Sequence, residues 1–136
     1  MICYAVIDTN VLVSALLSKH EDSATVQILE HILSKEIIPI YNTQILQEYQ
    51  EVLHRKKFHF PPQTVDTLIL SIKQFGIFFE PTSTNTILPD MKDLPFYEII
   101  MSLQHDDVYL ITGNTKHFPY DSHIVTAREL LDIQTQ

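Results

Sequence analysis

Short apolar runs alternate along this chain with segments of helical periodicity, and this alternation constrains the fold more than any other feature. Such alternation favours an α/β fold with a mainly parallel sheet. About five strands are expected, at residues 2–7, 37–41, 77–79, 108–112 and 123–126. Helices are expected over 11–18, 23–35, 44–56, 63–75, the residues that follow Asp93, and 127–133.

Local signals suggest where several of these elements begin and end. Ser23 and Thr43 are predicted to cap the helices that follow them, because a side-chain oxygen at that position accepts a free backbone N–H. Pro39 indicates an edge strand or a strand end, since proline cannot donate to a sheet. Gly76 is predicted to end the helix over 63–75, and residues 81–92 to form a polar loop.

Composition places few limits on function. The 136 residues predict a single domain over 1–136, long enough to bury a core. Cys3 is the only cysteine, so no internal disulfide is expected, and its place in an apolar strand predicts a buried, inert thiol. The chain opens without a basic region, and no apolar stretch approaches the roughly 20 residues of a membrane helix. We therefore expect a cytoplasmic location and no membrane partner.

The net charge of −8 argues against passive binding to nucleic acid. Proteins that bind nucleic acid in this way usually carry a basic surface. A bound divalent cation would offset part of the charge if several carboxylates were metal ligands. The remaining excess would be solvated or would face a basic partner.

Oxygen-bearing side chains follow two of the predicted strands. Asp8, Thr9 and Asn10 come directly after the strand at 2–7, and Thr112-Gly113-Asn114 ends the strand at 108–112. Sites in open α/β sheets gather at the carboxyl ends of the strands. Oxygen ligands without His or Cys suit Mg²⁺ or Mn²⁺, which usually serve phosphate chemistry. A helix cap is the alternative for Asp8, and a turn is the alternative for Asn114.

Helical phase separates two acids in the segment 44–56. At about 100° per residue, the apolar stripe of that segment is centred between Ile45 and Leu53. Glu48 falls at the border of this stripe, from where a carboxylate can enter a cleft. Glu51 points almost opposite and is expected to be solvated. The alternative for Glu48 is a surface charge close to the boundary.

Further acids lie around the helix that begins near residue 94. Asp93 is placed either to cap this helix or to face a metal at the sheet rim. Asp90 is a secondary candidate. Glu98 lies roughly opposite the apolar residues of the same helix, so it is expected to be mainly solvated and is a weaker candidate.

The remaining polar segments are weaker candidates. The basic stretch 54–59 is placed either to touch phosphate or to form a solvated helix end. His117 follows Asn114 and is expected either to line the mouth of a site or to lie in an ordinary loop. The chain has only two glycines, so it has no phosphate-cradling glycine-rich loop. Its Cys and His residues show no zinc spacing.

In this order, the motifs resemble those of the PIN domain family, and in particular its compact toxin-type subgroup. The resemblance covers nearly the whole chain. Its sharpest stretches are AVIDTNVLVSAL (5–16), LQEYQEVLHR (46–55), DMKDLPFYEIIM (90–101) and YLITGNTKHFP (109–119).

The resemblance implies a three-layer α/β/α fold and an acidic cluster that binds Mg²⁺ or Mn²⁺ and cleaves RNA. Asp8, Glu48 and Asp93 match the three central acidic positions, and Asn114 stands where many relatives have a fourth acid. The products implied are a 5′-phosphate and a 3′-hydroxyl. A toxin role, an antitoxin partner and a homodimer are implied as well. The secondary site candidates are Asn10, Asp90, Glu98, Thr112 and His117.

Two other functions stay open from the sequence. One is a PIN-like module that binds RNA or protein without catalysis, because the set of acids is incomplete. The other is a phosphoryl-acceptor domain, which also places Asp after a strand. The phosphatase form of that domain has a second Asp where this chain has Asn10, and the receiver form has a lysine after a late strand, near Lys116.

Overall fold

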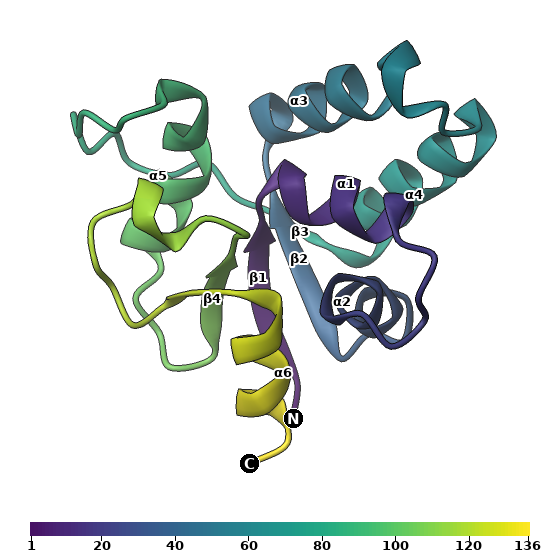
Figure 1. The fold of residues 1–136 in the computed structure, drawn as a ribbon. Helices are drawn as coiled ribbons and strands as arrows, with labels where there is room; N and C mark the ends of the chain where they lie inside the picture. Colours follow the sequence, from purple (N-terminus) through teal and green to yellow (C-terminus); the bar gives the residue numbers. More distant parts are fainter.

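The computed structural model describes residues 1–136 and contains one sheet of five parallel strands (Figure 1). The strands lie in the order β3-β2-β1-β4-β5, so β1 occupies the centre. Their bounds are β1 Cys3–Ile7, β2 Ile37–Tyr41, β3 Ile77–Phe78, β4 Val108–Ile111 and β5 Ile124–Val125. This arrangement confirms the prediction of a parallel sheet of about five strands.

Six α-helices connect and cover the strands, which gives the predicted α/β/α layering. Helix α2 packs on both α1 and α6, α3 packs on α4, and α5 packs against β1 and β4. Their bounds are α1 Thr9–Leu17, α2 Ala24–Leu33, α3 Thr43–Leu53, α4 Pro62–Phe75, α5 Leu94–Ser102 and α6 Ala127–Gln134. Three single 3₁₀ turns are η1 Lys56–Phe58, η2 Met91–Asp93 and η3 Thr115–His117. None of the helices has the length and apolar character needed to cross a membrane.

The pairing of the two central strands sets the position of the rim. Strands β1 and β4 are parallel, with Ile7 opposite Ile111. Every residue of β4 is buried, and in β1 only Tyr4 is partly exposed, as expected for a sheet covered on both faces. The thiol of Cys3 is fully buried, as predicted. Because Ile7 and Ile111 are paired, the residues that directly follow the two strands, Asp8 and Thr112, lie side by side at the end of the sheet.

Two local predictions were wrong. The strand that contains Pro39 is not at the edge of the sheet, because β2 lies between β1 and β3. Proline is tolerated there because pairing with β3 begins one residue later, at Ile40. The cap of α3 is Asn42 and not Thr43: the Asn42 side chain accepts the N–H of Ile45 at 2.9 Å. Ser23 caps α2 as predicted.

Gly76 ends α4 as predicted, and the structure shows that a side chain would not fit there. A Cβ atom would lie 2.6 Å from the carbonyl oxygen of Pro39 and even closer to that of Ile72, and both are backbone atoms. We expect Gly76→Ala to lower the free energy of unfolding by about 1–3 kcal/mol, since the turn between α4 and β3 must shift. Gly113→Ala is the matched control, because nothing lies within 4 Å of its Cβ position. Urea denaturation of both variants checks this, and equal stabilities would contradict it.

Candidate functional site

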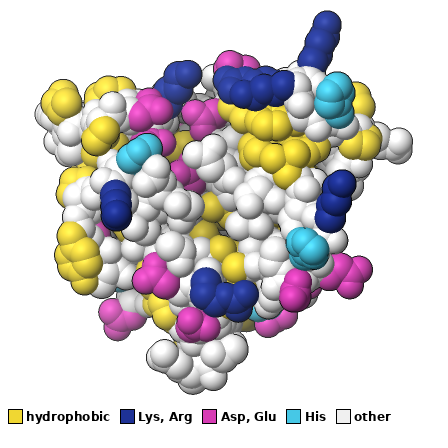
Figure 2. All heavy atoms as spheres, viewed as in Figure 1, with side chains coloured by type: hydrophobic (Ala, Val, Ile, Leu, Met, Phe, Trp, Pro, Cys, Tyr) yellow, Lys and Arg dark blue, Asp and Glu magenta, His cyan; other side chains and the backbone are white.

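A polar cleft of about 430 Å³ opens at the carboxyl end of the sheet. It collects acidic side chains from three separate elements: Asp8 after β1, Glu48 on α3 and Asp93 before α5. In Figure 2, acidic side chains lie in and around the hollow near the top of the molecule, where these elements meet in Figure 1. Its lining residues are Asp8, Thr9, Asn10, Gln44, Gln47, Glu48, Glu51, Val52, Arg55, Asp90, Lys92 and Asp93.

Asp8 is held at the end of β1 by its neighbour strand. Its backbone N–H donates to the carbonyl of Ile111 at 2.9 Å, and the Thr112 hydroxyl donates to its Oδ2 at 2.8 Å. Asp8 precedes α1, which begins at Thr9, but its side chain makes no capping hydrogen bond. The carboxylate is therefore buried at the base of the cleft, with only 5 % of the residue exposed.

Glu48 reaches the same place because its helix is anchored to β1. The hydroxyl of its neighbour Tyr49 is buried and donates to the carbonyl of Ile7, the last residue of β1. This contact brings the first turns of α3 against the end of the strand. The half-buried Glu48 then accepts a hydrogen bond from the hydroxyl of Thr9. The rim position inferred from helical phase agrees with this placement.

Glu51 is exposed to solvent, as expected, but it does not point away from the cleft. Glu51 lines the outer part of the same cleft, although its side chain is 74 % exposed, and it pairs with Arg55 at 3.4 Å. The reason is the direction of the cleft, which follows α3 along its length. Residues 44, 48, 51 and 55, spaced by three or four, all face it.

Asp93 occupies the N-cap position of α5 without capping it. Its side chain is 15 % exposed and turns to the cleft, where its Oδ2 lies 3.8 Å from Nδ1 of His117. Asp90 is exposed and also lines the cleft, but one of its oxygens accepts the N–H of Lys92 at 3.0 Å. Both acids thus come from the short segment before α5.

Asn114 lies beside the cleft and does not line it. Its backbone N–H donates to the Thr112 hydroxyl at 3.1 Å, and its side-chain nitrogen lies 2.9 Å from Nε2 of His117. Asn114 is therefore linked to Asp8 through Thr112 and to Asp93 through His117. Direct participation of Asn114 in the site remains a prediction.

Glu98 lies outside the cleft, and the expectation that it is solvated was wrong. It is partly buried, and its Oε2 accepts the backbone N–H of Thr84 at 2.6 Å and the Thr84 hydroxyl at 3.2 Å. The polar loop before α5 folds back over this helix and uses the carboxylate as an anchor. Helical phase alone does not show such a loop contact.

Sequence reasoning did not nominate several side chains that line the cleft, among them Thr9, Lys92 and Arg55. Thr9 stands inside the Asp8–Asn10 motif and holds Glu48. Lys92 lies between two candidate acids, Asp90 and Asp93, and this position in the sequence could have indicated that a cation lines the site. Arg55 was noted only as part of a basic stretch, yet it faces the cleft.

The carboxylates of the cleft are crowded and short of compensating charge. The pKa of Asp93 is raised to about 6, first by burial and then by repulsion from Asp8 and Asp90. Burial also raises the pKa of Asp8, against the stabilising hydrogen bond from Thr112. For Glu48, burial raises the pKa and the Thr9 hydroxyl opposes it. Each shift shows that the charged form of these acids is disfavoured where they lie.

The donor set matches a hard divalent cation. Carboxylate and hydroxyl oxygens surround the cleft, whereas sulfur is absent and His117 contacts only Asp93 and Asn114. A divalent cation would favour the charged forms of these acids, which burial disfavours at all three positions and repulsion between carboxylates disfavours at Glu48 and Asp93. As the side chains lie, no group of three acidic, histidine or cysteine residues is arranged to hold an ion. One oxygen of Asp8 and one of Glu48 accept hydroxyl hydrogen bonds instead.

The raised pKa of Asp93 predicts a pH-dependent stability for the metal-free protein. The Asp93 carboxyl has a pKa of about 6 in the folded state and about 3.9 in the unfolded state, so it binds its proton more tightly when the protein is folded. Protonation therefore stabilises the fold, and this contribution is complete below about pH 4. That contribution is lost as the pH rises through about 6, and it is at most about 3 kcal/mol. We expect the Tm in EDTA to fall between pH 4.5 and 7. Asp93→Asn should make this part of the profile flatter, and an unchanged slope would contradict the prediction.

The fold and this cleft together define a class: parallel α/β/α proteins with an acidic site at the carboxyl ends of their strands. The PIN domain family model matches residues 4–116, and the chain belongs to that family. PIN domains are generally metal-dependent nucleases. No curated protein and no solved structure matches the chain.

Proposed function

We propose that this protein is a Mg²⁺- or Mn²⁺-dependent endoribonuclease that hydrolyses RNA phosphodiester bonds. The observation that carries the proposal is the convergence of Asp8, Glu48 and Asp93 from three elements on one cleft. The cleft lies where α/β folds place their sites, and its oxygen donors suit ions that serve phosphate chemistry.

In this proposal the three carboxylates hold the cation. The bound cation would lower the pKa of a coordinated water and offset charge on the scissile phosphate. The hydroxyls of Thr112 and Thr9 orient the carboxylates of Asp8 and Glu48 by donating a hydrogen bond to one oxygen of each. Water serves as the nucleophile, which leaves a 5′-phosphate and a 3′-hydroxyl, and no Ser or Cys nucleophile is needed.

Incubation of the purified protein with end-labelled RNA tests the proposal. Cleavage is expected with Mn²⁺ or Mg²⁺ and not with EDTA, and the products should be substrates for ligation without phosphatase treatment. Cleavage that persists in EDTA, or products with 2′,3′-cyclic phosphate ends, would exclude this chemistry.

We further propose that the protein is the toxin of a toxin–antitoxin pair that acts as a homodimer on cytoplasmic RNA. The support is the resemblance of its motifs to the toxin-type subgroup of the family. Induced expression should arrest bacterial growth, and expression of Asp8→Asn should not. An antitoxin should be encoded beside the gene and should relieve the arrest.

A second candidate function is a PIN module that binds RNA or protein without cleaving it. Two observations favour it. Asn114 carries no charge at the position where many relatives have a fourth acid, and the acids as they lie are not arranged to hold an ion. Metal-dependent RNA cleavage by the wild-type protein would exclude this alternative.

The effect of the missing acid is itself testable. We expect the wild-type protein to bind one Mn²⁺ tightly and a second only weakly, because two ions about 3.5–4 Å apart need more negative charge than three carboxylates supply. Asn114→Asp should strengthen the second binding event in a calorimetric titration. Two equally tight ions in the wild type, unaffected by Asn114→Asp, would place Asn114 outside the site.

A further inference from the structure

Cationic side chains continue along one wall of the acidic cleft. The chain has only nine Lys and Arg residues, and three of them, Arg55, Lys56 and Lys57, are consecutive just after α3. Arg55 lines the cleft, as does Lys92 from the opposite side. Figure 2 shows dark blue side chains along the upper edge of the molecule, above the acidic hollow. The cations are thus concentrated at the site in a protein of net charge −8.

Lys56 and Lys57 are free to meet a ligand. Both are exposed, and neither has an acidic group within 4.0 Å, whereas Arg55 is already paired with Glu51. The other two acidic contacts of this kind involve the imidazole nitrogens of His54 and His117, and neither includes Lys56 or Lys57.

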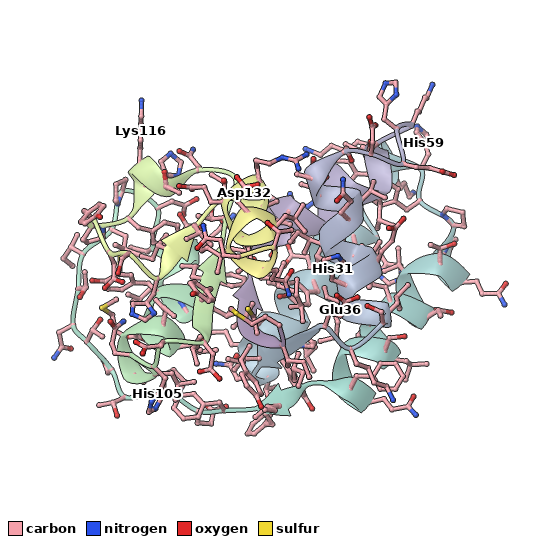
Figure 3. The ribbon with its side chains drawn as sticks, turned by 90° about the horizontal axis from the view of Figure 1, so that it is seen from below. His31, Glu36, His59, His105, Lys116 and Asp132 are labelled. Carbon is pink, nitrogen blue, oxygen red and sulfur yellow. The ribbon has the colours of Figure 1, made fainter.

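The turn that carries these lysines is well packed. Phe58 and Phe60 stack with their ring centres 5.3 Å apart, and Nζ of Lys57 lies 5.1 Å from the centre of the Phe58 ring. His59 adopts a left-handed conformation, with φ 56°, which reverses the chain before α4. It projects from the body of the molecule in Figure 3, near other long side chains at the same corner. This packing holds the backbone of the two lysines beyond the end of α3.

We propose that Lys56 and Lys57 form a subsite for the phosphate backbone of RNA that enters the cleft along α3. This inference rests on the proposed function, because the strand would lead to the carboxylates. Helix α3 ends at Leu53, five residues after Glu48, and both lysines lie in the 3₁₀ turn that follows this helix. The subsite would supply the attraction for RNA that the acidic cleft itself lacks.

An acidic protein partner is the other ligand that two free lysines could attract. RNA is favoured because Arg55, the residue directly before Lys56, lines the acidic cleft, so that the lysines adjoin the proposed site. A separate protein interface would not require this continuity with the site.

The test compares two double variants of equal net charge, K56E/K57E and the control K19E/K73E. The control lysines are also exposed, but Lys19 follows α1 and Lys73 lies near the end of α4, away from the turn after α3. Binding of a fluorescein-labelled 12-nucleotide oligouridylate is measured by anisotropy in EDTA at several salt concentrations. Loss of two phosphate contacts should lower the slope of log K against log salt by about 1.4 and weaken binding at low salt about tenfold or more. The control should keep the wild-type slope. Circular dichroism and the milder K56Q/K57Q variant show whether a loss reflects misfolding.

The outcomes separate this inference from the proposed function. Equal effects of the two double variants, or no effect of either, would overturn the subsite. So would a K56E/K57E variant that loses affinity for a polyglutamate peptide but keeps its RNA slope, since the ligand would then be an acidic protein. With Mn²⁺, K56E/K57E should raise KM for RNA cleavage and leave kcat nearly unchanged. A wild type that binds RNA through these lysines but cleaves none would contradict the nuclease proposal and leave the subsite intact.

Discussion

Asp8→Asn is expected to reduce Mn²⁺-dependent RNA cleavage about 100-fold or more. The substitution removes the most buried carboxylate of the cleft, and charge stabilisation by a bound metal is worth several kcal/mol, at about 1.4 kcal/mol per tenfold in rate. Mn²⁺ affinity measured by calorimetry should fall with it. The Thr112 hydroxyl can still donate to the oxygen of the introduced amide, so the fold should be retained.

The stability of this variant distinguishes a chemical role from a structural one. Because burial disfavours the charged form of Asp8, a neutral amide should leave the Tm in EDTA unchanged or higher at pH 7. Asp107→Asn is the matched control, since this exposed acid precedes β4 and so lies at the opposite end of the strands. Full cleavage by Asp8→Asn would rule out the proposed site.

Glu48→Gln should cost at least about tenfold more activity than Glu51→Gln. Both residues line the cleft and both changes remove one charge, so the pair is closely matched. Glu48 is half-buried and oriented by Thr9, whereas the Glu51 side chain is 74 % exposed and paired with Arg55. Ratios of kcat/KM for the two variants on one RNA measure the difference. A greater loss with Glu51→Gln would mean that the metal lies in the outer part of the cleft.

The fold followed largely from hydrophobic periodicity. Strongly apolar runs such as 108–111 have few alternatives to a buried strand, and helical spacing placed Glu48 at the rim. The cap at Asn42 was not predicted, because Asn42 and Thr43 are both good capping residues and only the backbone conformation decides between them. Position alone also could not decide whether an acid before a helix caps it. Asp8 and Asp93 both stand at N-cap positions and make no capping bond.

Contacts made by loops and between distant elements were the least accessible from sequence. Glu98 was expected to be solvated because no periodicity indicates that Thr84 folds back onto α5. The role of Glu51 in the cleft wall depends on the direction of the cleft, which tertiary packing of α3 sets. Lys92 escaped notice because a lysine between two acids is also typical of a solvated turn.

The hydrogen bond from Thr112 to Asp8 joins residues that are 104 positions apart. During translation, β1 and α3 emerge first, so Asp8 and Glu48 are made long before the strand that completes the rim. A nascent chain that ends before β4 leaves one edge of the central strand unpaired and lacks the hydroxyl that orients Asp8. The activity proposed for this cleft is thus tied to completion of the chain. Under the proposed function, the chain would become an active nuclease only after nearly the whole polypeptide has been synthesised.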